Sequence, residues 1–277
     1  MGARLVPFLL ADGHKVTVLD TQWFGHGDMP DNGSLKVING DVRDEDAYLK
    51  ACEDKDAVIW LASLSNNEMY GIDYDLTHAV NTCVRHAPVA KFIYASSVAV
   101  LDPTSDYAKD KLACEKMLEG TGAIIVRAAS ACGYSAHQRF DLTINKMTHD
   151  ACRTGRIVVN GGEQERSHVH LDDLCNFYRM ALKTGVNGET YTVWALNAKI
   201  GWTAQQVADI CGVSIVVKGR SDNRSYSVDG DSARSIGWAP KKAVWDAVRD
   251  LKWRFEAGYW PDSQTNPIYQ NMADGLV

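Results

Sequence analysis

The sequence lacks the features that mark several classes of protein. It has no apolar run near the roughly 20 residues that a membrane-spanning helix needs, and its start lacks the basic, apolar and small-residue order of a signal peptide. Its seven cysteines are scattered singly, with no CxxC pair and no histidine cluster at the spacing of zinc ligands. We therefore expect a cytoplasmic protein with reduced thiols, no metal site and no membrane partner.

A basic block is also missing. The 29 Lys and Arg residues stand against 35 Asp and Glu, which gives a formal net charge of -6. Binding to nucleic acid requires positive charge gathered on one surface, so we expect no nucleic-acid partner. A small anionic substrate remains possible, because two or three arginines are enough to hold one.

What the sequence does contain is an alternation of short apolar strands with helical stretches. The first strand, KVTVLD, ends in Asp20. Strands are expected at residues 15–20, 35–38, 57–61, 91–95 and 123–127, and helices at 3–11, 45–51, 76–86 and 107–118. Strands that are apolar on both faces and alternate with helices predict an α/β fold with a doubly wound parallel sheet of the Rossmann type.

After Arg127 the pattern becomes less regular. Helices are expected at residues 142–154, 172–183, 204–211 and 245–257, and strands at 157–160 and 190–195. The sequence contains no linker between lobes. We therefore predict an interleaved division, with residues 1–132 plus about 163–198 in a dinucleotide-binding Rossmann domain and about 133–162 plus 199–277 in a smaller substrate-binding lobe.

The first helix and strand match part of a dinucleotide-binding fingerprint. In a Rossmann unit a glycine-rich turn places the pyrophosphate on a helix N-terminus, and an acid at the end of the second strand binds the ribose. Gly2 corresponds to the last glycine and Asp20 to the acid, which favours NAD over NADP. The preceding strand and glycines are not in the sequence. Either the reading frame starts upstream or the molecule is shortened, lacking a central strand and most of the phosphate cradle; Gly2 alone would be an unremarkable terminal residue.

The strongest catalytic pattern joins a strand to the helix after it. The strand FIYASS ends in Ser97, and YAKDK follows with Tyr107 and Lys111 four residues apart, on one helical face. A free tyrosine has a pKa of about 10, but a nearby ammonium and a positive nicotinamide favour its phenolate. Tyr107 would then be a general acid/base, with Ser97 bound to the same substrate oxygen. A YxxxK pair alone is common by chance; the combination with the strand endings is more specific.

These patterns together resemble the NAD-dependent epimerase/dehydratase branch of the extended short-chain dehydrogenases/reductases. Similar stretches extend over almost the whole chain: LASLSNN at 61–67, LTHAVN at 76–81, RFDLTIN at 139–145, ERSHVHLDD at 165–173, RSY at 224–226 and IGWAP at 236–240. The resemblance implies NAD contacts from Gly2, Asp20, Asp41, Val42, Leu61, Ala62, Ser63, Asn81, Ala95, Tyr107 and Lys111. Asp41 would equally serve as a helix cap for residues 45–51.

The same resemblance implies a nucleotide-sugar substrate. Arg166 and Arg224 are expected to hold its diphosphate, Asn145 to lie near the sugar or pyrophosphate, and Ser97 to contact the sugar. Each arginine would equally suit a surface salt bridge. His168 and His170 are expected to be structural, and Asp172 or Asp173 to cap the next helix. The helices with Asn81 and Tyr107 resemble those of a homodimer interface.

The residues after Ser97 narrow the reaction. Dehydratases of this family carry an acidic pair there, and the 3,5-epimerising type carries a cysteine in that stretch, whereas this chain has Val98 and Ala99. We therefore expect a nucleotide-sugar epimerase that transiently oxidises a hydroxyl to a ketone. The alternatives are a net NAD(P)-dependent oxidoreductase of a keto-sugar nucleotide and a truncated, non-catalytic binding relative.

Overall fold

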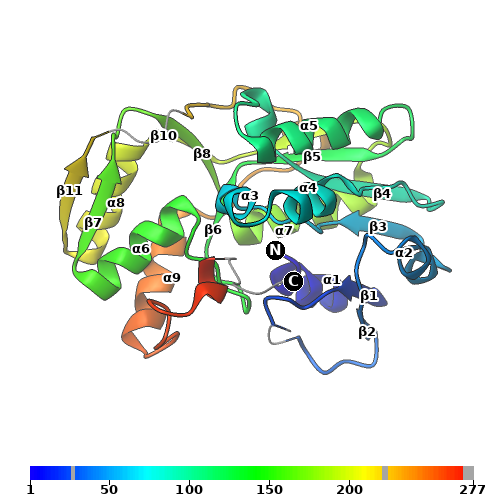
Figure 1. Cartoon of the computed structure of the whole chain (residues 1–277), viewed down its shortest axis with the longest axis horizontal. Helices are drawn as coiled ribbons and strands as arrows, with labels where there is room; N and C mark the ends of the chain where they lie inside the picture. Colours follow the sequence, from blue (N-terminus) through cyan, green and yellow to red (C-terminus); the bar gives the residue numbers. More distant parts are fainter. Residues whose placement is uncertain (26–28, 220–223, 271–277) are drawn as a thin grey trace.

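The computed structural model describes residues 1–25, 29–219 and 224–270. Its central sheet has four parallel strands in the order β3-β4-β5-β9. These strands are β3 (Ala57–Trp60), β4 (Lys91–Ser97), β5 (Ile124–Ala128) and β9 (Thr190–Val193). The α/β class and the parallel sheet predicted from the strand-helix alternation are confirmed (Figure 1).

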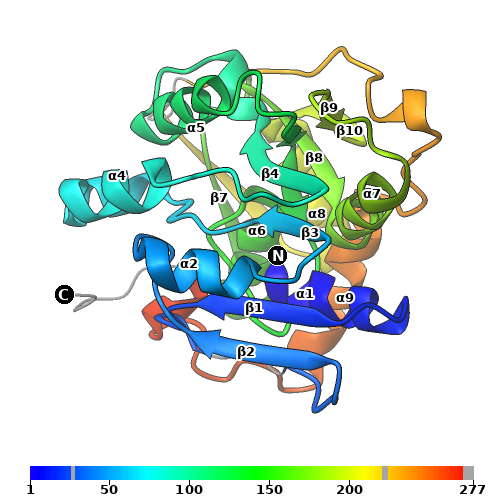
Figure 2. The same cartoon turned by 90° about the vertical axis from the view of Figure 1, so that its right-hand side faces the viewer.

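Two further parallel strands form a separate sheet beside β3. β1 (Val16–Asp20) pairs with β2 (Leu35–Asn39) from Val16 opposite Leu35 to Asp20 opposite Asn39. Within the part of the chain that is described, no strand lies between β1 and β3, and the sheet is divided at this place. Figure 2 shows the two sheets one above the other, with the start of α1 (Gly2–Ala11) beside the division.

Helices cover both faces of the central sheet, and strand β4 shows why. Ile93 and Ala95 face one layer, which includes α1 and α7 (Leu171–Thr184). Phe92 and Tyr94 face the other, which includes α2 (Glu45–Cys52) and α5 (Asp106–Met117). Successive side chains of a strand point to opposite faces, so a continuously apolar strand must be covered twice.

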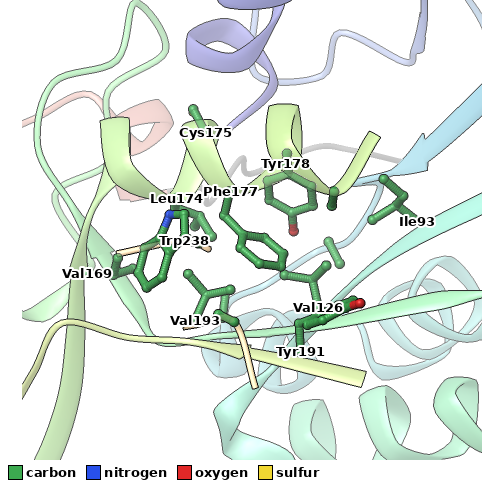
Figure 3. Packing of buried hydrophobic residues seen from close by; sticks show 14 of the residues in the cluster. Ile93, Val126, Val169, Leu174, Cys175, Phe177, Tyr178, Tyr191, Val193 and Trp238 are labelled. Atoms are coloured by element: carbon green, nitrogen blue, oxygen red, sulfur yellow. The ribbon is translucent and has the colours of Figure 1, made fainter. Parts of the chain in front are cut away.

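The layer under α7 is the larger of the two cores. Figure 3 shows Phe177 reaching from α7 toward Val126, Tyr191 and Val193 on the sheet. The ring of Phe177 lies 5.6 Å from that of Tyr191, measured between centroids. Burying a side chain of this size contributes about 1.5–3 kcal/mol, so this layer fixes the sheet whose carboxyl edge carries the predicted site.

A second hydrophobic cluster lies at the other end of the molecule (Figure 1). It is built on α6 (Thr143–Thr154), β7 (Arg156–Asn160), α8 (Ile200–Cys211), β11 (Ser214–Lys218) and α9 (Val244–Glu256). β7 and β11 are parallel. The three-stranded sheet β10-β8-β6 links the two ends; its strands are β6 (Ser130–Cys132), β8 (Glu165–His170) and β10 (Leu196–Lys199). The interleaved division of the sequence stays a prediction, which this separate cluster supports.

Several predicted boundaries differ from the structure. The helix expected at 76–86 is α4 (Tyr74–Thr82), which ends before Pro88, and α3 (Asn67–Ile72) precedes it. Strands β6, β8, β10 and β11 were not predicted. β8 reads ERSHVH, which has little apolar character, yet most of it is buried between two neighbours. Three single-turn helices complete the described elements: Val98–Leu101, Arg234–Ile236 and Pro267–Gln270.

All seven cysteines are free thiols, as the sequence predicts. Among the described helices none has the length and apolar character that crossing a bilayer requires.

Candidate active site

The predicted catalytic residues meet where β4 gives way to α5. Ser105 caps α5, with its hydroxyl accepting a hydrogen bond from the Ala108 amide at 3.3 Å. One turn separates Tyr107 from Lys111, and the Lys111 ammonium donates to the Ala95 carbonyl of β4 at 2.9 Å. Ser97 lies close enough to Tyr107 to favour ionisation of its phenol. The structure therefore brings Ser97, Tyr107 and Lys111 together.

The charges around Tyr107 differ from the expectation that the Lys111 ammonium favours its phenolate. Burial raises the pKa of Tyr107 to about 12, opposed by the positive charge of Arg139 and by the nearby Ser97 hydroxyl. Burial also lowers the pKa of Lys111 to about 8. The protein cation that favours the phenolate is thus Arg139, whereas Lys111 lies 5.8 Å from the centroid of the Tyr107 ring and is bound to backbone. The protein alone keeps Tyr107 as a neutral phenol at neutral pH.

An ion pair between α5 and β5 holds the end of β4 behind Ser97 and Tyr107. Ser96 donates to Glu115 of α5 at 2.5 Å, and Glu115 accepts three further bonds from the guanidinium of Arg127 on β5, at 2.5, 3.0 and 3.2 Å. Because each partner is on a different element, the contact fixes β4, β5 and α5 relative to one another.

Asn81 lies behind the loop that follows β3. Its side-chain oxygen accepts from the Ser63 hydroxyl and the Leu64 amide, both at 2.8 Å, and its amide group donates to the Leu64 carbonyl and to the hydroxyl of Tyr70. Tyr70 in turn donates to Asp110 at 2.6 Å. Asn81 is the one predicted cofactor contact that does not line the cavity described below; its geometry is that of a support for Ser63.

The other predicted cofactor residues lie at the carboxyl ends of parallel strands. Asp20 ends β1, and Asp41 with Val42 follows β2. Leu61, Ala62 and Ser63 follow β3, and Ala95 lies near the end of β4. Ligands of open α/β sheets bind at this edge. Asp41 does not cap the next helix, which was the alternative to a cofactor contact: the cap of α2 is Asp44, while Asp41 accepts from the amide and guanidinium of Arg43.

These strand ends border one cavity of about 1680 Å³. Single small-molecule pockets usually measure roughly 300–1,000 Å³, so this cavity has room for more than one ligand. It also extends along the full length of β1 and β3, into the division between the two sheets. Gly2 lines it, and a methyl group at Gly2 would meet only Leu61, at 4.0 Å.

The predicted substrate residues lie in the same cavity. Arg166, buried on β8, donates to the carbonyl of Arg224 and lies over the ring of Tyr226, 5.0 Å from its centroid. Asn145 opens the first turns of α6, accepting from the Gly133 amide at 2.9 Å and donating to the Arg139 carbonyl at 3.0 Å. All three predicted residues therefore line the cavity, although Asn145 is also used to hold the loop between β6 and α6.

Sequence reasoning did not single out Arg139 as a site residue. It lies in the cavity wall, where it pairs with Asp141 and donates to the Ser65 hydroxyl at 2.5 Å. Its charge acts on Tyr107. The RFDLTIN stretch contained the signal, but only the structure shows that this arginine lines the same cavity as Tyr107 and that its charge acts on Tyr107.

The histidines and acids around the start of α7 have structural surroundings. His168 is fully buried, which lowers its pKa to about 4. The cap of α7 is His170, whose ring accepts from the Asp172 amide, and not Asp172 or Asp173 as expected. Asp172 pairs with Arg4 and Lys242, both at 2.6 Å. Among the described residues, no group of three or more His, Cys, Asp or Glu is placed to hold a metal ion.

One known protein family matches more than half of the chain. The model of the NAD dependent epimerase/dehydratase family matches residues 1–195. The chain belongs to this family. A UDP-glucose 4-epimerase of Halalkalibacterium halodurans is 22% identical over 313 aligned positions, which cover 92% of each chain.

Solved structures of similar fold come from two reaction types. A dTDP-glucose 4,6-dehydratase of Streptomyces venezuelae, solved with NAD bound, has a TM-score of 0.82 at 20% identity, covering 92% of this chain and 94% of that one. A UDP-glucose 4-epimerase of Thermotoga maritima, solved with UDP-glucose, also has a TM-score of 0.82, at 19% identity, covering 92% and 95%. These likenesses confirm the Rossmann-type fold, and because both reaction types share it, the fold does not choose between them.

Proposed function

We propose that this protein is a nucleotide-sugar epimerase that inverts a carbon by transient, NAD-dependent oxidation of its hydroxyl to a ketone. The observation that carries the proposal is the grouping of Ser97, Tyr107 and Lys111 on the wall of a cavity that Arg166 and Arg224 also line. The first three residues suit proton transfer at a sugar hydroxyl, and the two arginines suit the binding of a diphosphate.

The residues present fit NAD at two ends of the cavity. Asp20 is exposed at the end of β1, and its carboxylate accepts only the Gln22 amide among the described contacts, so it is available to ribose hydroxyls. Lys111 and Tyr107 would hold the nicotinamide end, and the N-terminus of α1 would face the phosphates. Bound there, NAD would supply the reversible two-electron oxidation that the protein side chains cannot perform.

The protein side chains manage the proton. The Tyr107 oxygen, as phenolate, accepts the proton of the sugar hydroxyl and later returns it, while Ser97 holds the same substrate oxygen. Because burial raises the pKa of Tyr107 to about 12, a positive charge near the ring is needed for this role. Arg139 provides part of it; Lys111, held by the Ala95 carbonyl, keeps a second cation in reach.

The stretch after Ser97 favours epimerisation over loss of water. Elimination needs an acid to protonate the leaving hydroxyl and a base to remove a proton from the neighbouring carbon. Val98 is 1% exposed and Ala99 has no ionisable group, so this stretch supplies neither. Re-reduction of the ketone from its other face needs no additional acid.

We also propose a homodimer through α4 and α5. These helices pack side by side, and they present exposed apolar side chains, among them Tyr74 at 50% and Met117 at 56% exposure. An isologous pairing of this face would cover them. Light scattering of the purified protein tests the stoichiometry, and Met117→Glu should shift it toward the monomer.

The function is tested by cofactor content and product analysis together. Protein denatured after purification should release NAD, and incubation with UDP- and dTDP-hexoses should give an epimer pair, seen by NMR, with no net reduction of cofactor. Consumption of cofactor in proportion to product would instead indicate a net oxidoreductase. Absence of NAD, combined with no rise in Tm from any nucleotide sugar, would indicate a non-catalytic relative.

A further inference from the structure

A segment that follows α9 extends from the second hydrophobic cluster toward the ends of β1 and β3. This segment, residues 260–270, is here called the strap and is drawn in red in Figure 1. Its first residue, Trp260, has a φ of 53°. The left-handed region is unfavourable for a bulky side chain, and such a conformation persists only where the surrounding contacts hold it. The direction of the strap is therefore fixed by what it touches.

The base of the strap is bound to α6 and α9. The guanidinium of Arg153 on α6 donates to the Trp260 carbonyl at 2.5 Å and to the Ser263 hydroxyl at 3.1 Å. Ser263 is 1% exposed. The Trp260 ring lies 5.0 Å from that of Phe255 on α9, measured between centroids. These contacts anchor the first turn of the strap to two helices.

Hydrogen bonds join the tip of the strap, residues 266–270, to two loops that line the cavity. The Tyr269 carbonyl accepts from the backbone amide of Phe140, in the loop between β6 and α6, at 2.6 Å. The Gln270 carbonyl accepts from the side-chain amide of Asn66, in the loop after β3, at 2.9 Å. Asn66 is 5% exposed, and its side-chain oxygen caps α3. One buried side chain thus holds α3 by its oxygen and the strap by its nitrogen.

The tip also reaches the loop after β1. A methyl group at Gly25 would lie 3.6 Å from the Cδ1 atom of Ile268, which is contact distance. Gly25 and Asn66 both line the cavity, beyond the ends of β1 and β3. The tip therefore spans the interval between these two strand ends. In the proposed function the dinucleotide extends over the same interval, from Asp20 to Lys111.

We propose that the strap is a clasp that retains the dinucleotide in the cavity, with the side-chain amide of Asn66 as its catch. This inference rests on the proposed function, which supplies the dinucleotide site. While the catch is bonded, the tip joins the loops after β1 and β3 and blocks the way out between them. Release requires the tip to part from Asn66 and Phe140, while the base stays on α6. Slow release suits an enzyme that regenerates its cofactor in each cycle.

The dissociation rate of the dinucleotide measures the clasp. Purified protein is loaded with NADH and mixed rapidly with excess NAD, and the loss of bound nicotinamide fluorescence gives the rate. Asn66→Ser keeps a capping oxygen for α3 but loses the amide donor, and should raise the rate about 3–10-fold, the effect of one hydrogen bond. Asn66→Asp, which keeps the side-chain shape, should raise it at least as much.

Asn187→Ser is the matched control. Its exposed side-chain amide also donates to a backbone carbonyl, that of Ala90 at 3.1 Å, but it lies at the amino end of β4 and does not line the cavity. The dissociation rate should be that of the wild type. A rate within twofold of the wild type in both Asn66 variants would overturn the clasp and leave the proposed function standing, whereas protein that binds no NADH would refute both.

Hydrogen exchange tests the strap in the wild type, so the outcome does not depend on the folding of a variant. The Phe140 amide is bonded to the strap, and its exchange should slow when NADH is bound, because the clasp is then held closed. In cofactor-free Asn66→Ser the same amide should exchange faster than in the cofactor-free wild type. Exchange at Phe140 that NADH leaves unchanged, or that is equal in the variant and the wild type, would overturn the proposal.

Discussion

The two walls of the cavity are built in different ways. The catalytic wall, formed by β4, α4 and α5, is crossed by buried side-chain contacts: Lys111 to Ala95, Glu115 to Ser96 and Arg127, and Asn81 to the loop after β3. The wall proposed to bind the nucleotide, here called the nucleotide wall, is formed by β1, β2 and the outer edge of β3. Its strand pair is separated from the main sheet, and among the described residues the side chains of Asp20 and Asp41 form hydrogen bonds only with residues two positions away.

The difference follows what each wall must do. Side chains that transfer protons need to be held to a fraction of an ångström, and buried networks provide this. In the proposed function, strand ends and backbone would bind the ribose and adenine, and such contacts tolerate a more open wall. A two-stranded sheet is marginally stable by itself, so we expect bound ligand to contribute more order to the nucleotide wall than to the catalytic wall.

The largest expected effect is on the catalytic wall. Tyr107→Phe removes the proton carrier and should lower kcat roughly 10²–10⁴-fold, while the protein still releases NAD on denaturation and unfolds at an unchanged Tm. Tyr259→Phe, on an exposed tyrosine, is the control and should keep full activity. Retention of most activity in Tyr107→Phe would refute the assigned role.

The second prediction concerns the cost of a buried ammonium. Burial lowers the pKa of Lys111 to about 8, so between pH 8 and the unfolded value near 10.5 the unfolded chain binds more protons than the folded one. Stability from this residue is therefore lowest below pH 8 and rises as pH increases, by at most about 3 kcal/mol.

Lys111→Met should remove this slope. Chemical denaturation should show the variant at least as stable as the wild type at pH 7, with the advantage shrinking toward pH 10, although its catalysis fails. A wild-type and a variant curve that run parallel from pH 7 to 10 would contradict the assignment.

The third prediction compares the two walls directly. Asn81→Ala leaves the Leu64 amide and carbonyl without partners in a buried place, and should lower the free energy of unfolding by about 2–3 kcal/mol. Asp41→Ala removes exposed contacts and should change it by less than about 0.5 kcal/mol. Equal effects, measured by urea denaturation of cofactor-free protein, would break the distinction between the walls.

The smallest effect is on cofactor choice. Asp20→Ala should weaken NAD binding by roughly tenfold and bring the affinity for NADP closer to that for NAD, because the carboxylate no longer repels a 2′-phosphate. Stability should be unchanged, since Asp20 is exposed. Calorimetric titration with both dinucleotides measures the ratio; an unaltered preference would remove Asp20 from the ribose site.

The catalytic wall was more predictable from sequence than the rest because its signals are local. Tyr107 and Lys111 lie one helical turn apart, and Ser97 directly ends an apolar strand. Residue spacing alone therefore predicted that the three side chains lie close together. Arg139 acts on Tyr107 from a loop far along the chain, and no periodicity reports such a contact. Short strands such as β8 were missed because their neighbours bury them, whatever their own polarity.

The most direct test mixes NAD-loaded protein rapidly with its nucleotide sugar and follows the fluorescence of reduced nicotinamide. A transient signal that returns to its starting level while product accumulates, and that is strongly reduced in Tyr107→Phe, is the predicted result. Epimer formation with no reduced cofactor at any time, and with equal rates in Tyr107→Phe, would contradict the mechanism.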